Sequence, residues 1–142
     1  MQTNTESSAA TPDDGGDTDS DKLPLNGGSS YDLYASVDGK GAIAFSSTST
    51  GQQYAGIKWN RVSTSQSLAI TFTLSSDIQY FETESAPVLT FDPVDSGHQK
   101  ASVVPDSNNK IECHFNAYIN DPVKPGVLIK VVDPVIVISV KP

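Results

Sequence analysis

Two histidines, His98 and His114, are the side chains best suited to acid–base chemistry near neutral pH. His114 follows Cys113, the only cysteine, but neighbours on a strand point to opposite faces, so the two cannot form a thiolate pair. No G-x-S-x-G sequence marks a serine nucleophile. Because the spacing brings no nucleophile, base and carboxylate together, we predict that the chain is not an enzyme.

Three aspartates near the N-terminus, Asp17, Asp19 and Asp21, have the spacing with which a calcium-binding loop begins. The rest of such a loop is missing. Its sixth position is Lys22, where glycine is needed, and its twelfth is Gly28, where a bidentate glutamate is needed. We therefore interpret these aspartates as part of an acidic terminal segment.

A second acidic cluster, FDPVDSGH, contains Asp92, Asp95 and His98. We expect these residues to lie in one loop, and they are the candidates for a calcium site of the kind that β-sandwiches hold between loops. Zinc would need about four soft ligands, more than one cysteine and two histidines supply. Glycine-rich phosphate loops are absent, so the sequence implies no cofactor.

Aromatic side chains could form a sugar-binding platform on a β-sandwich. Trp59 and Tyr80 alternate in step with aliphatic residues, which predicts that both are in the core. Phe81 and Tyr118 fall on the opposite faces of their strands. These two are therefore the candidates for exposed ligand-binding aromatics.

The charge is acidic throughout. The chain carries −8, and its single arginine, Arg61, leaves no basic stripe for phosphates. We therefore predict no binding to nucleic acid or to an anionic membrane. No basic and apolar leader opens the sequence, and no apolar run reaches the roughly 18 residues of a spanning helix, which favours a soluble cytoplasmic protein.

The elements that carry these residues are predicted to be short strands. Apolar residues recur at every second position over 67–75 and 110–119, which is the period of a half-buried strand. Asp38-Gly39 predicts a tight hairpin that pairs 31–37 antiparallel with 41–47. The remaining predicted strands are 54–60, 78–83, 87–91, 99–104, 126–132 and 135–141.

About 8–10 such strands with regular turn signals predict an all-β fold, an immunoglobulin-like antiparallel sandwich. All eleven aromatic residues lie between Tyr31 and Tyr118. Residues 1–30 are instead rich in Ser, Thr, Asp and Gly, with six acidic residues and one lysine. We predict a disordered acidic tail over 1–30 and one sandwich domain over 31–142.

The last predicted strand is apolar on both faces at Val135, Ile136, Val137 and Ile138, and 127–132 is nearly so. A strand covered on both faces within its own domain would have this composition. An edge or face that meets another subunit would have it too. The sequence leaves both interpretations open, and these four residues are therefore interface candidates.

Two dipeptides carry a resemblance to a known family. Asp133-Pro134 precedes an apolar strand, and Asp92-Pro93 follows one. In these features and in domain length the chain resembles the DP-EP family of uncharacterised bacterial β-sandwich proteins. The EP dipeptide is missing, and Lys141-Pro142 stands near its expected place. The resemblance implies a bacterial source and an immunoglobulin-like fold, and no activity or functional residue.

Two function classes follow from these observations. The first is a non-enzymatic module for protein interaction or self-assembly, which would use the apolar C-terminal strands. The alternative is a carbohydrate-binding or adhesin-type module that uses exposed aromatics, with a loop calcium as an aid. The expected partner is thus a protein or a second copy in the first case and a glycan in the second.

Overall fold

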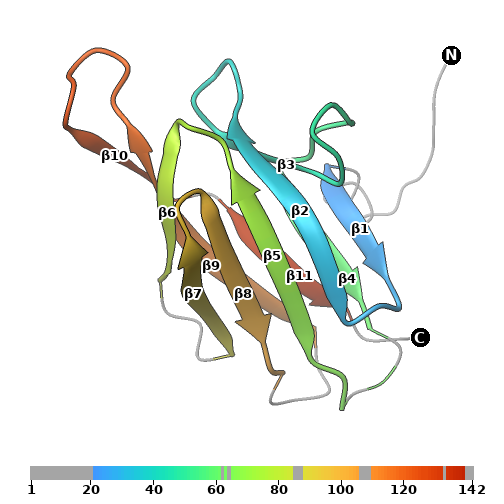
Figure 1. Cartoon of the computed structure of the whole chain (residues 1–142). Helices are drawn as coiled ribbons and strands as arrows, with labels where there is room; N and C mark the ends of the chain where they lie inside the picture. The colour runs from blue at the N-terminus through green and yellow to red at the C-terminus, as the bar shows by residue number, and fades with distance from the viewer. Residues whose placement is uncertain are drawn as a thin grey trace, which may run out of the picture.

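The computed structural model describes residues 21–61, 63, 65–84, 88–105, 110–132 and 134–139. These residues form eleven strands and no helix, which confirms the all-β sandwich (Figure 1). In chain order the strands are β1 (Lys22–Asn26), β2 (Ser30–Val37), β3 (Ile43–Ser46), β4 (Gly56–Asn60), β5 (Leu68–Leu74), β6 (Ile78–Thr83), β7 (Leu89–Asp95), β8 (His98–Val103), β9 (Ile111–Asn120), β10 (Leu128–Val131) and β11 (Val135–Ser139).

Two sheets make up the sandwich. One has the order β3-β2-β5-β8-β7, and the other has the order β1-β4-β11-β9-β10 with β6 also paired to β9. The sheets are mixed, because β1 and β11 each run parallel to β4, and β2 runs parallel to β5. β10 and β11 pair antiparallel with two successive parts of β9, residues 117–120 and 111–114. β6 pairs antiparallel with residues 115–119 of β9, which overlap the part that pairs with β10. β6 and β10 therefore lie on opposite edges of β9.

The domain begins earlier than the predicted boundary at residue 31. β1 lies at the edge of its sheet, where Leu23 and Leu25 alternate into the core and Pro24 points outward. Proline is tolerated there because an edge strand has one side without ladder hydrogen bonds. The predicted tail over 1–30 is thus wrong for 22–30, since these two leucines bury enough apolar surface to hold the segment. Residues 1–20 lie outside the described residues.

The predicted hairpin of β2 and β3 is confirmed, since Val37 pairs with Ile43 in an antiparallel ladder. Its turn is wider than Asp38-Gly39 alone. Asp38 N donates to Ala42 O, and the residue with positive φ is Gly41. The Asp38 carboxylate accepts hydrogen bonds from the backbone N–H groups of Lys40 and Ala42. These bonds to Ala42 and Lys40 lower the pKa of Asp38 below its ordinary value.

Replacing Asp38 with alanine is expected to lower the Tm by a few degrees at pH 7. Because the folded-state pKa of Asp38 is lowered, its stabilisation is present above the unfolded pKa and is lost as the pH falls through the folded value. Thermal melts of the wild type and of Asp38→Ala should therefore converge below pH 3.8. A difference in Tm that stays constant with pH would contradict this role of the carboxylate.

The core between the sheets is built on aromatic rings. Five phenylalanines form one connected cluster with ring centroids 5.1–6.2 Å apart: Phe45, Phe72, Phe81, Phe91 and Phe115. Trp59 is fully buried, as predicted, and its indole Nε1 donates to the Gly28 carbonyl at 2.9 Å. Cys113 is also buried and packs as a small apolar residue.

β11 lies between β4 and β9, inside its sheet. Ile136 and Ile138 belong to the core, and Val137 on the other face is only 2% exposed. Val135, at the start of the strand, is half-buried. The proposal that Val135–Ile138 forms an intersubunit surface is therefore wrong, because the domain's own strands flank this segment and both of its faces are covered.

Candidate functional site

The three metal candidates lie on the hairpin of β7 and β8, which a turn at Ser96-Gly97 closes with a positive φ at Gly97. Asp95 Oδ1 and His98 Nδ1 form a hydrogen bond. Asp92 is paired in register with Lys100 instead. The described residues contain no group of three or more His, Cys, Asp or Glu side chains placed to hold a metal ion. Asp92 is therefore not brought to the Asp95–His98 pair.

The structure places the two aromatic candidates, Phe81 and Tyr118, in different surroundings. Phe81 is 2% exposed and lies in the core, so its assignment as an exposed ligand-binding residue is wrong. The reason is a register shift in β6 between Ile78 and Tyr80, which reverses the faces of the residues that follow. Tyr80 is consequently exposed and stacks on Tyr118, with ring centroids 4.7 Å apart.

The Tyr118 hydroxyl donates a hydrogen bond to Glu82 at 3.2 Å. Partial burial and this carboxylate raise the pKa of Tyr118 above its ordinary value. The hydroxyl is therefore a neutral donor at physiological pH. The hydrogen bond to Glu82 holds the ring in place.

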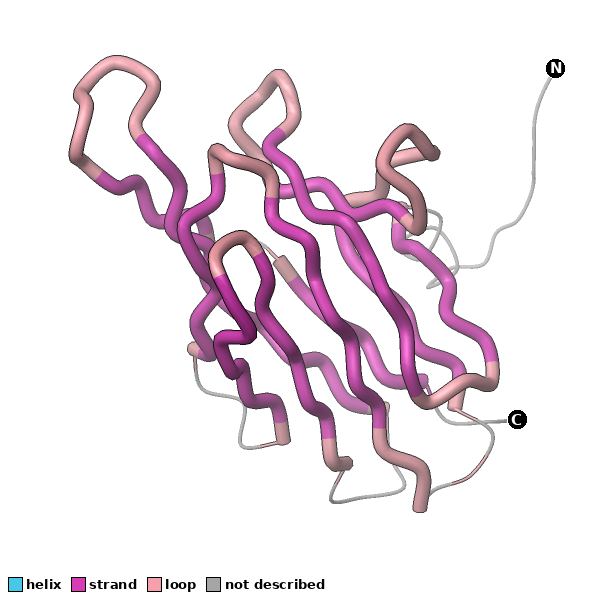
Figure 2. The backbone as a smooth tube through the Cα atoms, viewed as in Figure 1, coloured by secondary structure: helices cyan, strands magenta, loops and turns pink. Residues whose placement is uncertain are grey.

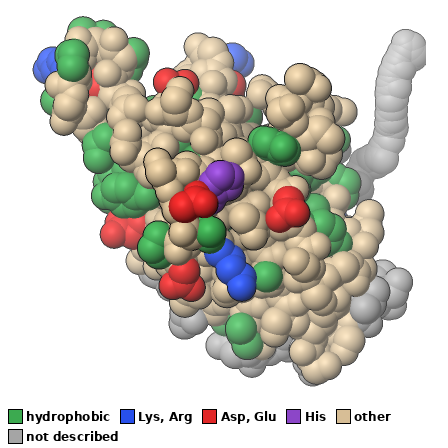
Figure 3. Space-filling view, viewed as in Figure 1, with side chains coloured by type: hydrophobic (Ala, Val, Ile, Leu, Met, Phe, Trp, Pro, Cys, Tyr) green, Lys and Arg blue, Asp and Glu red, His purple; other side chains and the backbone are tan. Residues whose placement is uncertain are grey.

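Among the described residues, the largest group of exposed apolar side chains lies on and around β10. Exposure ranges from 38% at Ile129 to 80% at Val123, and the group is Val123, Val127, Leu128, Ile129 and Val132. The β9–β10 hairpin projects from the end of the sandwich as a separate lobe with apolar and basic side chains on its surface (Figures 1 and 3). Exposed apolar residues gathered in this way are typical of an interaction site.

The backbone of β10 has one open edge. β9 is the only strand that pairs with β10 among the described residues. Asp121 N donates to Val127 O at 2.9 Å, so residues 121 and 127 form a hydrogen-bonded antiparallel pair. Because such pairs alternate along the ladder, Ile129 and Val131 bond to β9. The N–H and C=O groups of Leu128 and Lys130 must then point away from β9, toward the open side.

Every other edge of the described sheets carries a feature that blocks further pairing. β1 has Pro24 and β7 has Pro93 next to a register shift. In β3, the N–H and C=O of Phe45 bond to Tyr54. β6 is closed by the Gln99 side chain, which bonds the N–H and C=O of Phe81. β10 has only the charge of Lys130 to discourage pairing.

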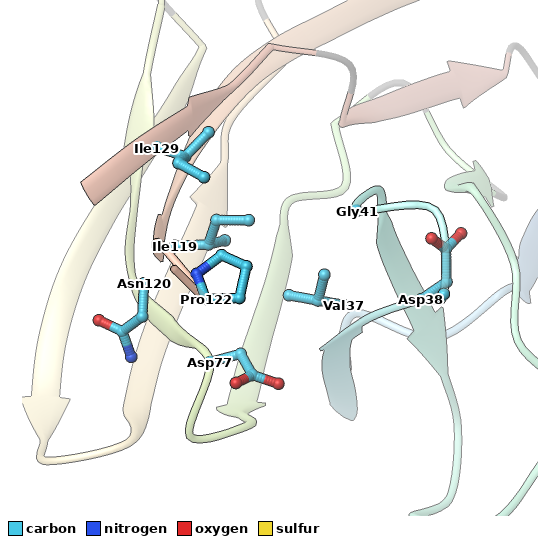
Figure 4. Close-up of a pocket in the computed structure, with 9 residues that line it drawn as sticks. Val37, Asp38, Gly41, Asp77, Ile119, Asn120, Pro122 and Ile129 are labelled. Atoms are coloured by element: carbon cyan, nitrogen blue, oxygen red, sulfur yellow. The ribbon is translucent and has the colours of Figure 1, made fainter. Parts of the chain in front are cut away.

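A cavity of about 420 Å³ opens beside the inner face of the hairpin. Three turns at the same end of the sandwich surround it: β2–β3, β5–β6 and β9–β10 (Figure 2). Ile119, Pro122 and Ile129 lie together on one side and Val37 lies opposite (Figure 4). The remaining lining residues are Asp38, Gly39, Gly41, Asp77 and Asn120. Ile129 is thus accessible from the cavity as well as from the edge.

Comparison with known proteins identifies no family. No protein-family model matches the chain, and no curated protein has a significantly similar sequence. The resemblance to the DP-EP family therefore stays a prediction. The described residues contain no helix that is long and apolar enough to cross a membrane.

The sequence contained part of the signal for this site. The near-continuous apolar run over 127–132 is such a signal, but the interface candidates that the sequence yields are the residues of the following segment, Val135–Ile138. Both segments are rich in β-branched residues. Only the strand order shows that β11 has a neighbour on each side and β10 has one.

Proposed function

We propose that this chain is a non-enzymatic protein-interaction module that takes up a β-strand of another polypeptide along the open edge of β10. The observation that carries the proposal is the row of outward backbone groups at Leu128 and Lys130 beside exposed apolar side chains. Strand addition uses such an edge, since backbone hydrogen bonds give affinity and alternate side chains give specificity.

The side chains around the edge supply the energy for binding. Ile129 and Val127 are each exposed by more than a third, and burying a Val or Ile side chain fully contributes about 1.5–3 kcal/mol. The outward groups of Leu128 and Lys130 would add hydrogen bonds worth about 0.5–1.5 kcal/mol each. A partner strand with apolar residues at alternate positions satisfies both requirements.

A carbohydrate-binding module has weaker support. Tyr80 and Tyr118 are the aromatic pair nearest to such a platform, and their planes are only 24° apart. Because the rings stack on each other, each covers one face of the other. Sugar platforms need free ring faces, so this arrangement favours packing between the two tyrosines over a glycan.

The proposal predicts that a single proline will block the edge. Lys130→Pro removes an outward N–H without removing a ladder bond to β9, and Lys130→Thr removes the same charge while it keeps the N–H. A displayed library of short random peptides, selected on the wild type, should yield peptides with alternating apolar residues. We expect Lys130→Pro to lower the affinity for these peptides by about tenfold or more, since a loss of 1.4 kcal/mol in binding free energy is tenfold in affinity.

The threonine variant should bind the same peptides nearly as well as the wild type. Circular dichroism establishes that both variants fold. Selected peptides that bind Lys130→Pro and Lys130→Thr with equal affinity would show that recognition does not use this edge, and the proposed function would then be abandoned.

A further inference from the structure

We infer that the strand taken up by β10 is β10 of a second copy of this chain, paired antiparallel about Ile129. The inference rests on the proposed function, because it names the partner at the same edge. It follows from the residue pattern of 127–131, VLIKV, which is complementary to itself when one copy is turned by a half rotation about an axis through Ile129.

The hydrogen-bonding groups match in this register. The outward groups of β10 belong to Leu128 and Lys130. Turning a second strand about Ile129 sets Leu128 opposite Lys130 of the other copy, and the reverse. Each of these two pairs can exchange both of its N–H···O=C bonds. The pair between the Ile129 residues is then a non-hydrogen-bonded one, in which side chains come closest.

The side chains match as well. Ile129 and Val131 share a face with Ile119 and Ala117 of β9, and Val127 continues that face. In the symmetric register Val127 stands opposite Val131 of the other copy, and Ile129 stands opposite Ile129. Cross-strand pairs of β-branched residues of this kind stabilise a sheet. The apolar row would continue from Ile119 of one copy to Ile119 of the other.

Neighbouring registers are disfavoured by named residues. An axis through Lys130 would place the two Lys130 side chains directly opposite each other, and like charges in that position are destabilising. An axis through Leu128 would bring Pro125 and Gly126 into the ladder, where proline lacks an N–H. The axis through Ile129 avoids both problems.

The N-terminal segment of the same chain is a poor alternative occupant. Residues 1–20 contain no Leu, Ile, Val or aromatic residue, so they have little apolar surface to cover this edge. A symmetric pair of β10 strands also uses the open edge of both copies. The assembly therefore closes as a dimer and leaves no free edge of this kind for a fibre.

Cysteine substitution tests the register. In the symmetric pair the two Ile129 Cα atoms are about 4.5 Å apart, within the range that a disulfide spans. Ile129→Cys should form a disulfide-linked dimer under mild oxidation about tenfold or more faster than Lys130→Cys, because pairing raises the effective thiol concentration. A mixture of Leu128→Cys and Lys130→Cys should give the mixed dimer. Non-reducing gels and mass spectrometry report both products.

The wild type is the matched control for these variants, because its Cys113 is buried and should not cross-link.

The surface that a five-residue strand pair buries is smaller than the roughly 1,200 Å² buried in stable complexes, so we expect a weak, concentration-dependent dimer. Light scattering over a concentration range of about a hundredfold should show the molar mass rising from that of a monomer toward that of a dimer, both for the wild type and for Lys130→Thr. Lys130→Pro should remain a monomer.

Two results would overturn the inference. Equal cross-linking rates for Ile129→Cys and Lys130→Cys would reject the register. A wild-type mass that stays that of a monomer at every concentration, without cross-linking of Ile129→Cys, would reject a second copy as the partner. In that case selected peptides that are still sensitive to Lys130→Pro would uphold strand addition, so the failure of the dimer differs from the failure of the proposed function.

Discussion

Replacing Phe81 with alanine is expected to lower the free energy of unfolding by about 3–5 kcal/mol, the usual effect of removing a core phenylalanine. The Phe81 ring is 2% exposed and lies 5.2–6.2 Å, between ring centroids, from four other phenylalanine rings. The substitution therefore leaves a cavity at the centre of the aromatic cluster. Denaturant unfolding with an unchanged slope would measure the loss as a shift of the midpoint.

The neighbouring residue gives the control for Phe81. Tyr80 is 40% exposed, and its ring contacts only Tyr118 among the described aromatic rings. Tyr80→Ala should cost about 1 kcal/mol, the size of one aromatic pair. If the two substitutions had equal effects, or if Tyr80→Ala had the larger one, the register of β6 would be wrong by one residue.

Tyr80 and Phe81 also show where a prediction from the alternation of apolar residues fails. The sequence IQYFET aligns Tyr80 with Ile78 and sets Phe81 on the opposite face. The structure has a register shift after Ile78, so Phe81 instead follows Ile78 into the core. One extra residue in a strand reverses every face beyond it, and no residue type in this stretch signals the bulge.

Strands with uninterrupted alternation were predicted correctly. β5 alternates strictly, with Leu68, Ile70 and Phe72 buried. β1 has the same pattern in Leu23 and Leu25, but it lies next to a polar segment whose composition is typical of disorder. Composition averaged over 1–30 hid a strand of five residues. Composition is therefore a poor guide to a domain boundary where a short edge strand begins the fold.

Features that depend on strand order could not be predicted from the sequence. The turn in DSGHQ, by contrast, is a local signal that the sequence predicts, and it joins β7 to β8. The open edge of β10 has no such local signal. It exists because β4 pairs with β11 and does not extend beside β10. Parallel pairing between segments far apart in the chain decides this, and alternation within one segment carries no information about it.

Gln99 is a residue of β8, and its side chain reaches from that sheet to β6, at the other edge of β9's sheet. Its side-chain Oε1 accepts from Phe81 N, and its Nε2 donates to Phe81 O, both at 2.8 Å. The amide thus binds the outward backbone groups of β6 as a neighbouring strand would. Gln99 itself is 8% exposed, so water cannot readily replace it.

Replacing Gln99 with methionine is expected to lower the free energy of unfolding by about 2–6 kcal/mol. Methionine has a similar length and fits the space, but it leaves a buried N–H and a buried C=O without partners, at about 1–3 kcal/mol each. Gln79→Met is the matched control, because Gln79 is exposed on β6, the strand that Gln99 binds, and its side chain bonds the Asn120 side chain at 2.9 Å. That substitution should stay within about 0.5 kcal/mol.

Gln99→Glu separates the hydrogen bonds from the packing. A glutamate has the same shape, and when protonated it can both accept from Phe81 N and donate to Phe81 O. When ionised, its buried carboxylate faces the Phe81 carbonyl oxygen, which disfavours the charged form. The folded-state pKa of this glutamate should therefore rise above the ordinary 4.3. The folded state then holds a proton that the unfolded state has lost, and stability must fall as the pH rises through that interval. Gln99→Met has no group that titrates there. In thermal melts between pH 5 and 7, the Tm of Gln99→Glu should therefore fall progressively relative to that of Gln99→Met. If the Tm values of the two variants changed in parallel with pH, the Gln99 amide would not bind the β6 backbone.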